Sequence, residues 1–229
     1  MTAVDDDSRP SRQQISDAVG ERGWRLMLGA IYGEVVVSSL AEAADSAALA
    51  VAAAGPAAQG HLTIDIRSDR AVLRLQSAAA GAVTGRDVRL AGVVAEGLAA
   101  RGRLLTPRGG AVQALEVAID ALDIPAVRPF WKAITGYVDE AGPSDLTDAL
   151  VDPLGRGPAI WFQKMDAPRP QRNRIHLDLD VPHDAARGRI EAALAAGGRL
   201  LSDAEAPAFW VLADPEGNEA CICTWQGRD

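Results

Sequence analysis

The chain of 229 residues contains only two cysteines, Cys221 and Cys223. They are separated by one residue in a β-strand pattern, so their side chains point to the same face and are poorly placed to bond to each other. Few cysteines and no disulfide pattern are typical of proteins in a reducing compartment. We therefore predict two free thiols and a cytoplasmic protein.

Long apolar segments are also missing. No apolar run is longer than a short alanine-rich stretch, which argues against a transmembrane helix. Residues 1–7 carry three aspartates and no cationic segment, so we do not expect a signal peptide.

Positive charge is scarce relative to negative charge. The 23 Lys and Arg residues face 31 Asp and Glu residues, which gives a formal net charge of −8. An acidic balance argues against nucleic acid or an anionic membrane as a partner. We therefore expect neither as a partner. The hydrophobic fraction of 48% is ordinary for a globular chain with a core.

The first part of the chain shows the element order α-β-α-β-β-α. The segments are a helix at 11–19, a β-rich stretch at 24–38 that turns around Gly29 and Gly33, a helix at 39–54, strands at 61–66 and 71–75, and a helix from Thr84. Residues 102–110 then have the composition of a linker. We predict a first domain at residues 1–104, a linker at 105–111 and a second domain at 112–229.

The second part contains a weak internal repeat, which predicts two copies of one structural unit. The first copy has a strand at 115–120, a helix through Phe130 and Trp131, and a strand at 159–163. The second copy has a strand at 175–180, a helix at 190–194, and strands at 209–212 and 219–224. The predicted fold class is α+β, with βαβ(β)β units paired in the second domain.

Alternation in three of these strands separates an apolar face from a polar one. The polar face carries Glu116 and Asp120 from the first strand, His176, Asp178 and Asp180 from the second, and Glu219, Cys221 and Cys223 from the last. Such a face is either solvated or lines a cleft, and alternation alone favours solvation.

The second part resembles the glyoxalase-like domains of the vicinal-oxygen-chelate superfamily. The segments that carry the resemblance are LEVAIDALDIPAVRPFWKAITGY, NRIHLDLDVPHD and LADPEGNEACICTW, and it spans about residues 112–226. The DPEGN turn at residues 214–218 is its most specific piece. The resemblance implies a divalent metal on the concave sheet face, with one ligand from each of four strands. The implied ligands are Glu116, Gln163, His176 and Cys221.

This ligand set suits zinc, nickel or manganese, and the cysteine favours zinc. By the resemblance, the metal polarises neighbouring substrate oxygens, and His176 has a catalytic role. Asp178, Trp161 and Trp210 are the candidate substrate-binding residues, the two tryptophans as aromatic walls of the cleft, although aromatic strand residues more often belong to the core. The alternative is that His176 is a cleft histidine hydrogen-bonded to Asp178, and Cys221 a small packed residue.

The first part resembles pterin-4a-carbinolamine dehydratase, a small α/β sandwich, over about residues 11–101. The clearest segment is VTGRDVRLA at residues 83–91. The family works with three histidines, of which two stand together before a proline. Here those positions read Gly60-His61-Leu62, and the third segment reads Ser77-Ala78-Ala79. The implied catalytic residues that remain are His61 and Asp87.

Loss of two histidines matters because dehydration of a carbinolamine needs both a proton donor and a base. We therefore expect the dehydratase fold with little or no dehydratase activity. The alternative readings are a strand-edge histidine for His61 and a first-turn acidic residue behind the Thr84 cap for Asp87.

Three functions remain open. The first is a lyase or isomerase of the glyoxalase type, the second a non-catalytic protein that sequesters a ligand, and the third a dehydratase that works with His61 alone. We also expect a homodimer, because strands such as 71–75 would expose unpaired backbone edges.

Overall fold

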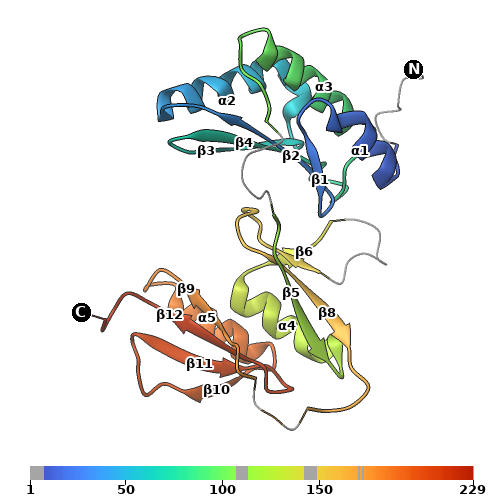
Figure 1. The fold of residues 1–229 in the computed structure, drawn as a ribbon. Coiled ribbons are helices and arrows are strands. Elements are labelled where there is room, and N and C mark those ends of the chain that lie inside the picture. The colour runs from blue at the N-terminus through green and yellow to red at the C-terminus, as the bar shows by residue number, and fades with distance from the viewer. Residues whose placement is uncertain (1–7, 107–112, 142–148, 170, 172, 229) are drawn as a thin grey trace. The chain divides into compact units, whose positions relative to one another are not determined.

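The computed structural model describes residues 8–106, 113–141, 149–169, 171 and 173–228. Within these residues the fold is mixed α+β, with three four-stranded sheets and five α-helices (Figure 1). The chain divides into two compact units between Ala114 and Leu115. Among the helices described, none combines the length and the hydropathy needed to cross a membrane.

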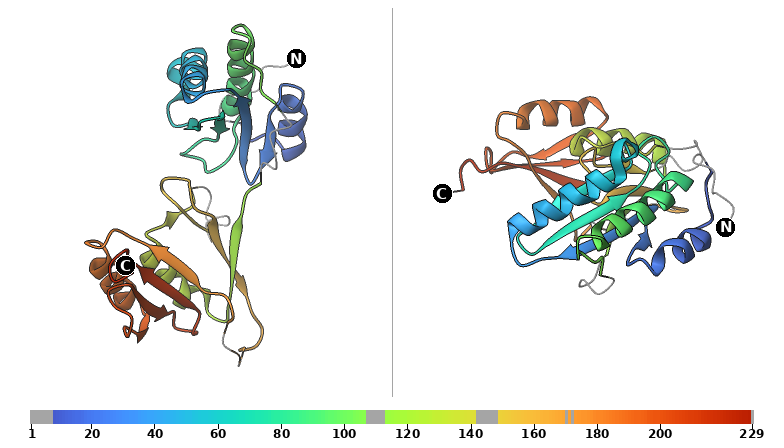
Figure 2. Two further views of the ribbon diagram at one scale, coloured as in Figure 1. Left: turned by 60° about the vertical axis from the view of Figure 1, so that its left-hand side comes forward. Right: turned by 90° about the horizontal axis from the view of Figure 1, so that it is seen from above.

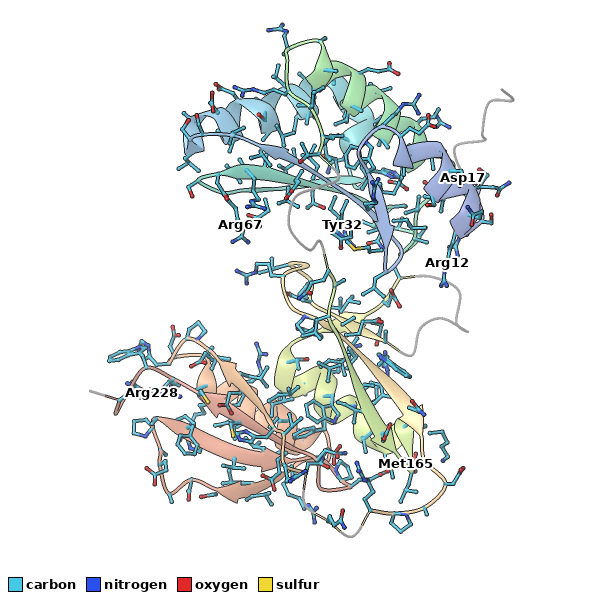
Figure 3. The ribbon with its side chains drawn as sticks, viewed as in Figure 1. Arg12, Asp17, Tyr32, Arg67, Met165 and Arg228 are labelled. Carbon is cyan, nitrogen blue, oxygen red and sulfur yellow. The ribbon has the colours of Figure 1, made fainter. Side chains whose placement is uncertain are left out.

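The first unit is an antiparallel sheet covered by helices. Its elements are α1 (Arg12–Gly20), β1 (Arg25–Met27), β2 (Ala30–Val36), α2 (Leu40–Ala54), a 3₁₀ turn (Gly55–Ala58), β3 (Leu62–Ile66), β4 (Arg70–Leu75) and α3 (Gly85–Ala99). The strands lie in the order β1-β2-β4-β3. Helices α2 and α3 contact each other and cover one face of this sheet (Figure 2). Tyr32 lies on the face away from them, where its hydroxyl accepts a hydrogen bond from Arg74 (Figure 3).

Each helix of this unit begins where a side chain can cap it. The hydroxyl of Ser11 accepts from the backbone N–H of Gln14, and that of Ser39 accepts from the N–H of Glu42. Thr84 caps α3 through a capping box. The three predicted helices are confirmed, with starts within one residue of those expected.

Two predictions for this unit are wrong. Gly33 lies inside β2 rather than at a turn. A Cβ at this position would come within 2.8 Å of the buried Trp24 ring, so the close approach of the ring explains the glycine. The turn is formed by Leu28 and Gly29, where φ is +41° and +70°. Strand 71–75 is not an exposed edge, since it belongs to β4, which pairs with β2 on one side and β3 on the other. The edge strands are β1 and β3.

The first unit extends beyond the predicted boundary at residue 104. Leu105 packs against its core, and the backbone N–H of Thr106 donates to the carbonyl of Glu34 at 3.0 Å. These two residues had been assigned to the linker. The other linker residues, 107–111, lie outside the described residues.

The second unit contains two four-stranded sheets. Its elements are β5 (Glu116–Ala121), α4 (Ile124–Thr135), β6 (Val138–Asp139), β7 (Leu150–Val151), β8 (Ala159–Lys164), β9 (Leu177–Asp180), α5 (Ala186–Ala195), β10 (Arg199–Ser202), β11 (Phe209–Ala213) and β12 (Glu219–Cys223). The strand orders are β5-β8-β7-β6 and β10-β11-β12-β9. In each sheet the first strand of the copy pairs in parallel with the last, β5 with β8 and β9 with β12. The predicted repeat is therefore present.

One apolar core joins the two copies. It includes Phe130 and Trp131 from α4, whose rings meet edge to face with centroids 5.5 Å apart, and Ile222 from β12. Gly198 admits the Phe130 ring, since a Cβ at that position would lie 2.4 Å from it. The shared core holds the two sheets, and hence the residues they carry, in a fixed arrangement.

Candidate functional site

The polar faces of β9 and β12 meet as neighbours. In their parallel register Leu177 lies opposite Ala220, and Asp178 opposite Cys221. Because side chains alternate along a strand, Asp178 and Cys221 project from the same face of the sheet. His176 directly precedes β9, two residues before Asp178, and points to the same side.

Three side chains converge here, and we refer to His176, Asp178 and Cys221 as the His–Asp–Cys cluster. His176 Nδ1 lies 3.1 Å from Asp178 Oδ1 and 3.6 Å from Cys221 Sγ. One candidate ligand atom from each residue lies within 4.8 Å of the other two. Cys221 is buried, whereas the side chains of His176 and Asp178 are about half exposed. A nitrogen, an oxygen and a sulfur at this spacing could hold a divalent metal ion.

Burial sets the protonation of the cysteines. Burial, a hydrogen bond with Asp178 and the charge of that carboxylate raise the pKa of Cys221 to about 12. The pKa of Cys223 is also raised, first by burial and then by the charges of Asp178 and Asp180. Both cysteines are free. Both are therefore neutral thiols at pH 7 when nothing else binds them.

This protonation predicts slow thiol chemistry. Because the thiolate is the nucleophile, Cys221 in the folded Cys223→Ser variant at pH 8 should react with a disulfide reagent at least about 10²-fold more slowly than in the same chain unfolded in guanidinium, where the cysteine pKa is about 8.5. The rate should rise with pH throughout the range from 8 to 10. Stopped-flow absorbance of the released thiolate measures it, with the unfolded chain as the control. Rates within tenfold of each other would contradict the burial argument.

The structure does not bring Glu116 and Gln163 together. Glu116 lies opposite Ala159 at the start of the β5–β8 pair, whereas Gln163 lies opposite Asp120, four residues further along. At about 3.3 Å per residue, four residues correspond to roughly 13 Å. Nor is Glu116 a member of the His–Asp–Cys cluster. Glu116 instead lies near Glu140, whose pKa is raised first by burial and then by the negative charge of Glu116.

The repeat indicates why Gln163 falls at a different place from Cys221. Residues 116 and 118 in the first copy correspond to residues 176 and 178 in the second. Ala118 lies opposite Trp161, just as Asp178 lies opposite Cys221. The first-copy counterpart of Cys221 is therefore Trp161, which is 37% exposed, and the counterpart of Gln163 is Cys223.

A cleft of about 740 Å³ lies beside the cluster, within the second unit. The residues that line it come from β5 and the residue after it, from α4, from the segment between β8 and β9, from the turn before β12, and from the first residues of β9 and β12. They are Val117, Ala118, Ile119, Asp120, Leu122, Trp131, Met165, Pro168, Arg169, Gln171, Asn173, Arg174, Ile175, His176, Leu177, Glu216, Gly217, Asn218 and Glu219. Met165, directly after β8, can be found in Figure 3. Such a volume suits a small organic ligand.

His176 belongs both to the cleft lining and to the His–Asp–Cys cluster. The other predicted site residues of the second unit, Glu116, Trp161, Gln163, Asp178, Trp210 and Cys221, are not in the lining. Trp210 packs against the core instead. Sequence reasoning missed Arg169 and Arg174, which bring positive charge to the cleft, because the segment that carries them has no periodic pattern.

The DPEGN turn forms one wall of the cleft through a hydrogen-bonded aspartate. Asp214 is fully buried and accepts from the backbone N–H groups of Glu216 and Asn218, both at 2.9 Å. Its other oxygen accepts from the Asn218 amide at 2.8 Å and from the indole N–H of Trp131 at 3.0 Å. The Glu216 carboxylate in turn accepts from the N–H groups of Leu122 and Asp123. The turn thus joins the second copy of the repeat to the start of α4 in the first.

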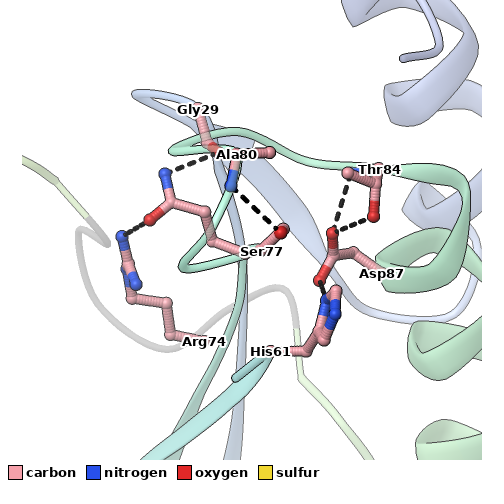
Figure 4. A network of polar contacts seen from close by, with 8 residues as sticks. Gly29, His61, Arg74, Ser77, Ala80, Thr84 and Asp87 are labelled. Carbon is pink, nitrogen blue, oxygen red and sulfur yellow. Dashed lines mark hydrogen bonds and ion pairs between the residues drawn. The ribbon is translucent and has the colours of Figure 1, made fainter. Parts of the chain in front are cut away.

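In the first unit, His61 and Asp87 form a separate polar pair. His61 Nδ1 lies 2.8 Å from Asp87 Oδ1 (Figure 4). Asp87 is fully buried, and its second oxygen accepts from the backbone N–H and the hydroxyl of Thr84, both at 2.7 Å. A carboxylate at Nδ1 favours the tautomer with hydrogen on that atom, which leaves Nε2 able to accept a proton. The His61 side chain is 12% exposed. The structure thus brings the two predicted residues of this unit together.

One comparison with known proteins gives a match to most of the second unit. Residues 116–223 match the family model described as "Glyoxalase-like domain". A comparison with curated proteins gave no match. Among solved structures, a glyoxalase/bleomycin resistance protein/dioxygenase family enzyme from Burkholderia phytofirmans is 24% identical, with 48% of this chain and 95% of that chain covered and a TM-score of 0.39. The fosfomycin resistance protein FosX from Listeria monocytogenes is 11% identical, with 52% and 94% covered and a TM-score of 0.40. A FosX variant solved with Mn(II) and 1S,2S-dihydroxypropylphosphonic acid is 11% identical, with 52% and 95% covered and a TM-score of 0.41.

Proposed function

Because residues 116–223 match the glyoxalase-like domain family, we propose that the second unit is a lyase or isomerase that acts on a small molecule with the help of a divalent metal ion. The observation that carries this proposal is the position of His176. It belongs to a cluster of metal-ligating atoms and also lines the 740 Å³ cleft. A substrate in the cleft would therefore lie next to the ion.

The residues around the cleft suit a polar substrate. An ion held by the cluster would supply Lewis-acid polarisation of substrate oxygens. Arg169 and Arg174 can donate hydrogen bonds to a carboxylate or another anionic group of the substrate. Trp131 and Leu177 are among the residues that give the cleft apolar surface. Before an ion binds, the Asp178 carboxylate lies 3.1 Å from His176 Nδ1, and this contact can hold the imidazole ring in the orientation in which it would bind the ion.

The metal requirement can be tested on untagged full-length protein. We expect one equivalent of zinc, nickel or manganese to remain bound after incubation and gel filtration, as measured by elemental analysis. His176→Ala should lose this equivalent and keep the wild-type circular dichroism spectrum, because the side chain is half exposed and its removal leaves no cavity. His183→Ala is the matched control and should bind as wild type does.

A wild-type protein that stays metal-free with all three ions would overturn the metal requirement. It would leave ligand sequestration in the same cleft as the better function, with binding and no turnover. Assay of the metal-loaded protein with small carbonyl, epoxide and thiol-adduct substrates separates an enzyme from a binding protein.

We propose, as a second candidate, residual dehydratase activity of the first unit, favoured by the contact between His61 and Asp87. The pair offers one base, whereas the reaction needs both an acid and a base. The homodimer and the cytoplasmic location stay predictions. The two free cysteines are compatible with the reducing environment of the cytoplasm.

A further inference from the structure

We infer that the second unit holds its metal with three ligands from one copy of the repeat, His176, Asp178 and Cys221, and that the site selects zinc over manganese. This inference rests on the proposed function, and it departs from the four-strand ligand set implied by resemblance. Asp178 replaces the ligands that Glu116 and Gln163 would otherwise supply.

The distances within the cluster fit a tetrahedral zinc ion. Bonds of about 2.3 Å to sulfur and about 2.0 Å to nitrogen at a tetrahedral angle place the two atoms about 3.5 Å apart. The observed distance between Cys221 Sγ and His176 Nδ1 is 3.6 Å. Two ligands with bonds of about 2.0 Å lie about 3.3 Å apart at the same angle. His176 Nδ1 and Asp178 Oδ1 are 3.1 Å apart.

The backbone pairing of β9 with β12 places the side chains of the cluster next to one another. Asp178 and Cys221 are direct partners across the parallel β9–β12 pair, and residues of a directly opposed pair have neighbouring side chains. His176 follows from the same alternation, two residues before Asp178. Buried Cys221 anchors the cluster, while half-exposed His176 and Asp178 leave the remaining side open to solvent and substrate. Three protein ligands with one open position are typical of catalytic zinc.

Among the described residues of the first copy there is no comparable set. The residue opposite Ala118, at the place of Cys221, is Trp161, which has no ligand atom for zinc. Glu116 and Gln163 are offset along the strands by roughly 13 Å of backbone, so they are not neighbours across the β5–β8 pair as Asp178 and Cys221 are across β9–β12.

The donor set decides the choice of ion. A thiolate and an imidazole are preferred by zinc, whereas manganese and magnesium prefer sites made of oxygen atoms. With one sulfur, one nitrogen and one oxygen, the cluster should also accept Co²⁺, which reports sulfur ligation by an intense charge-transfer absorption in the near ultraviolet.

Titration of the apo full-length protein with Co²⁺ tests the inference directly. We expect a sulfur-to-cobalt band that saturates at one equivalent and disappears when one equivalent of zinc is added, but persists in excess manganese. Cys221→Ser should abolish the band. Cys223→Ser is the matched control, because it removes a buried thiol from the same face of the same strand two residues away, and it should keep the band.

The carboxylate ligand is tested in the same way. Asp178→Asn should weaken zinc binding at least about tenfold, measured by competition with a chromophoric chelator, because even residues that only support a ligand typically contribute 10- to 100-fold. Asp180→Asn and Glu116→Gln should bind zinc as wild type does. His176→Ala, at a half-exposed position, guards against loss of the band through misfolding, and it should lose the band with its fold unchanged.

The possible failures are distinguishable. A site that binds metal but loses it in Glu116→Gln, or keeps the band in Cys221→Ser, would overturn this inference and leave the proposed metal-dependent function intact. Preference for manganese over zinc would also overturn it. A wild-type protein that takes up none of these ions would overturn the metal requirement itself.

Discussion

Asp214→Ala is expected to destabilise the second unit by about 3 kcal/mol or more. The substitution removes the acceptor of four hydrogen bonds, and one of the donors, the Trp131 indole N–H, belongs to a side chain that is 2% exposed. A buried donor that loses its acceptor costs about 1–3 kcal/mol, and the backbone donors of the turn add to that. Guanidinium unfolding followed by circular dichroism, together with tryptophan fluorescence, measures the change.

Two variants serve as controls for this prediction. Glu216→Ala removes an exposed carboxylate that accepts from the N–H groups of Leu122 and Asp123, and it should cost less because water can replace it there. Asp214→Asn keeps the shape and one acceptor oxygen, so it should fall between the two. A loss below about 1 kcal/mol in Asp214→Ala would show that the turn is held by other contacts.

Dehydration of 4a-hydroxytetrahydropterin by this protein should be about 10²–10⁴-fold slower than by pterin-4a-carbinolamine dehydratases that have the complete set of histidines. The reason is that Gly60 and Ala78, which cannot transfer protons, stand where the resemblance implies two of those histidines. His61→Ala should remove what turnover remains, since its Nε2 is the available base. Single-turnover absorbance measurements on the full-length protein give the rates, and turnover close to that of histidine-complete relatives would contradict the prediction.

The two positions at which the resemblance implies histidine differ in how well they could hold one. Gly60 has φ of +73°, a conformation that side chains rarely adopt, so a histidine there would be strained. Ala78 is exposed, and Ala78→His should be accommodated and should raise the rate. Ala79→His, at the next exposed position, is the control and should leave the rate unchanged.

The helices of the first unit could be predicted because their signals are local. Ser11, Ser39 and Thr84 mark their starts, and the caps depend on residues within four positions. Strand order is not local. The pattern of strand 71–75 says that it is a strand, but its place between β2 and β3 depends on partners distant in the chain.

Strands that are very short or fully exposed could not be predicted from the sequence either. Strands β6 and β7 have two residues each, too few for alternation to show, and β10 is exposed along its whole length. The strand predicted at 175–180 begins only at Leu177 in the structure, and Ile175 is 81% exposed.

Part of the candidate site followed from alternation and part did not. Alternation gave His176, Asp178 and Cys221 a common face, and the structure brings the three together. The resemblance implied Gln163 as a ligand, but its position opposite Asp120 depends on the register between β5 and β8, which no local pattern encodes. Arg169 and Arg174 belong to a segment without regular structure, so only the fold could place them at the cleft.

The parallel pairing of β9 with β12 also bears on how the second unit folds. The β11–β12 hairpin needs only contacts close in the chain, whereas His176 and Cys221 are 45 residues apart. Contacts between distant residues form slowly because a long loop must close first. We therefore expect β9 to pair with β12 late, after the β11–β12 hairpin has formed and after the transition state for folding. A ligand that ties β9 to β12 then stabilises the native state more than the transition state. Zinc bound at the cluster should therefore slow unfolding and leave the rate of folding nearly unchanged.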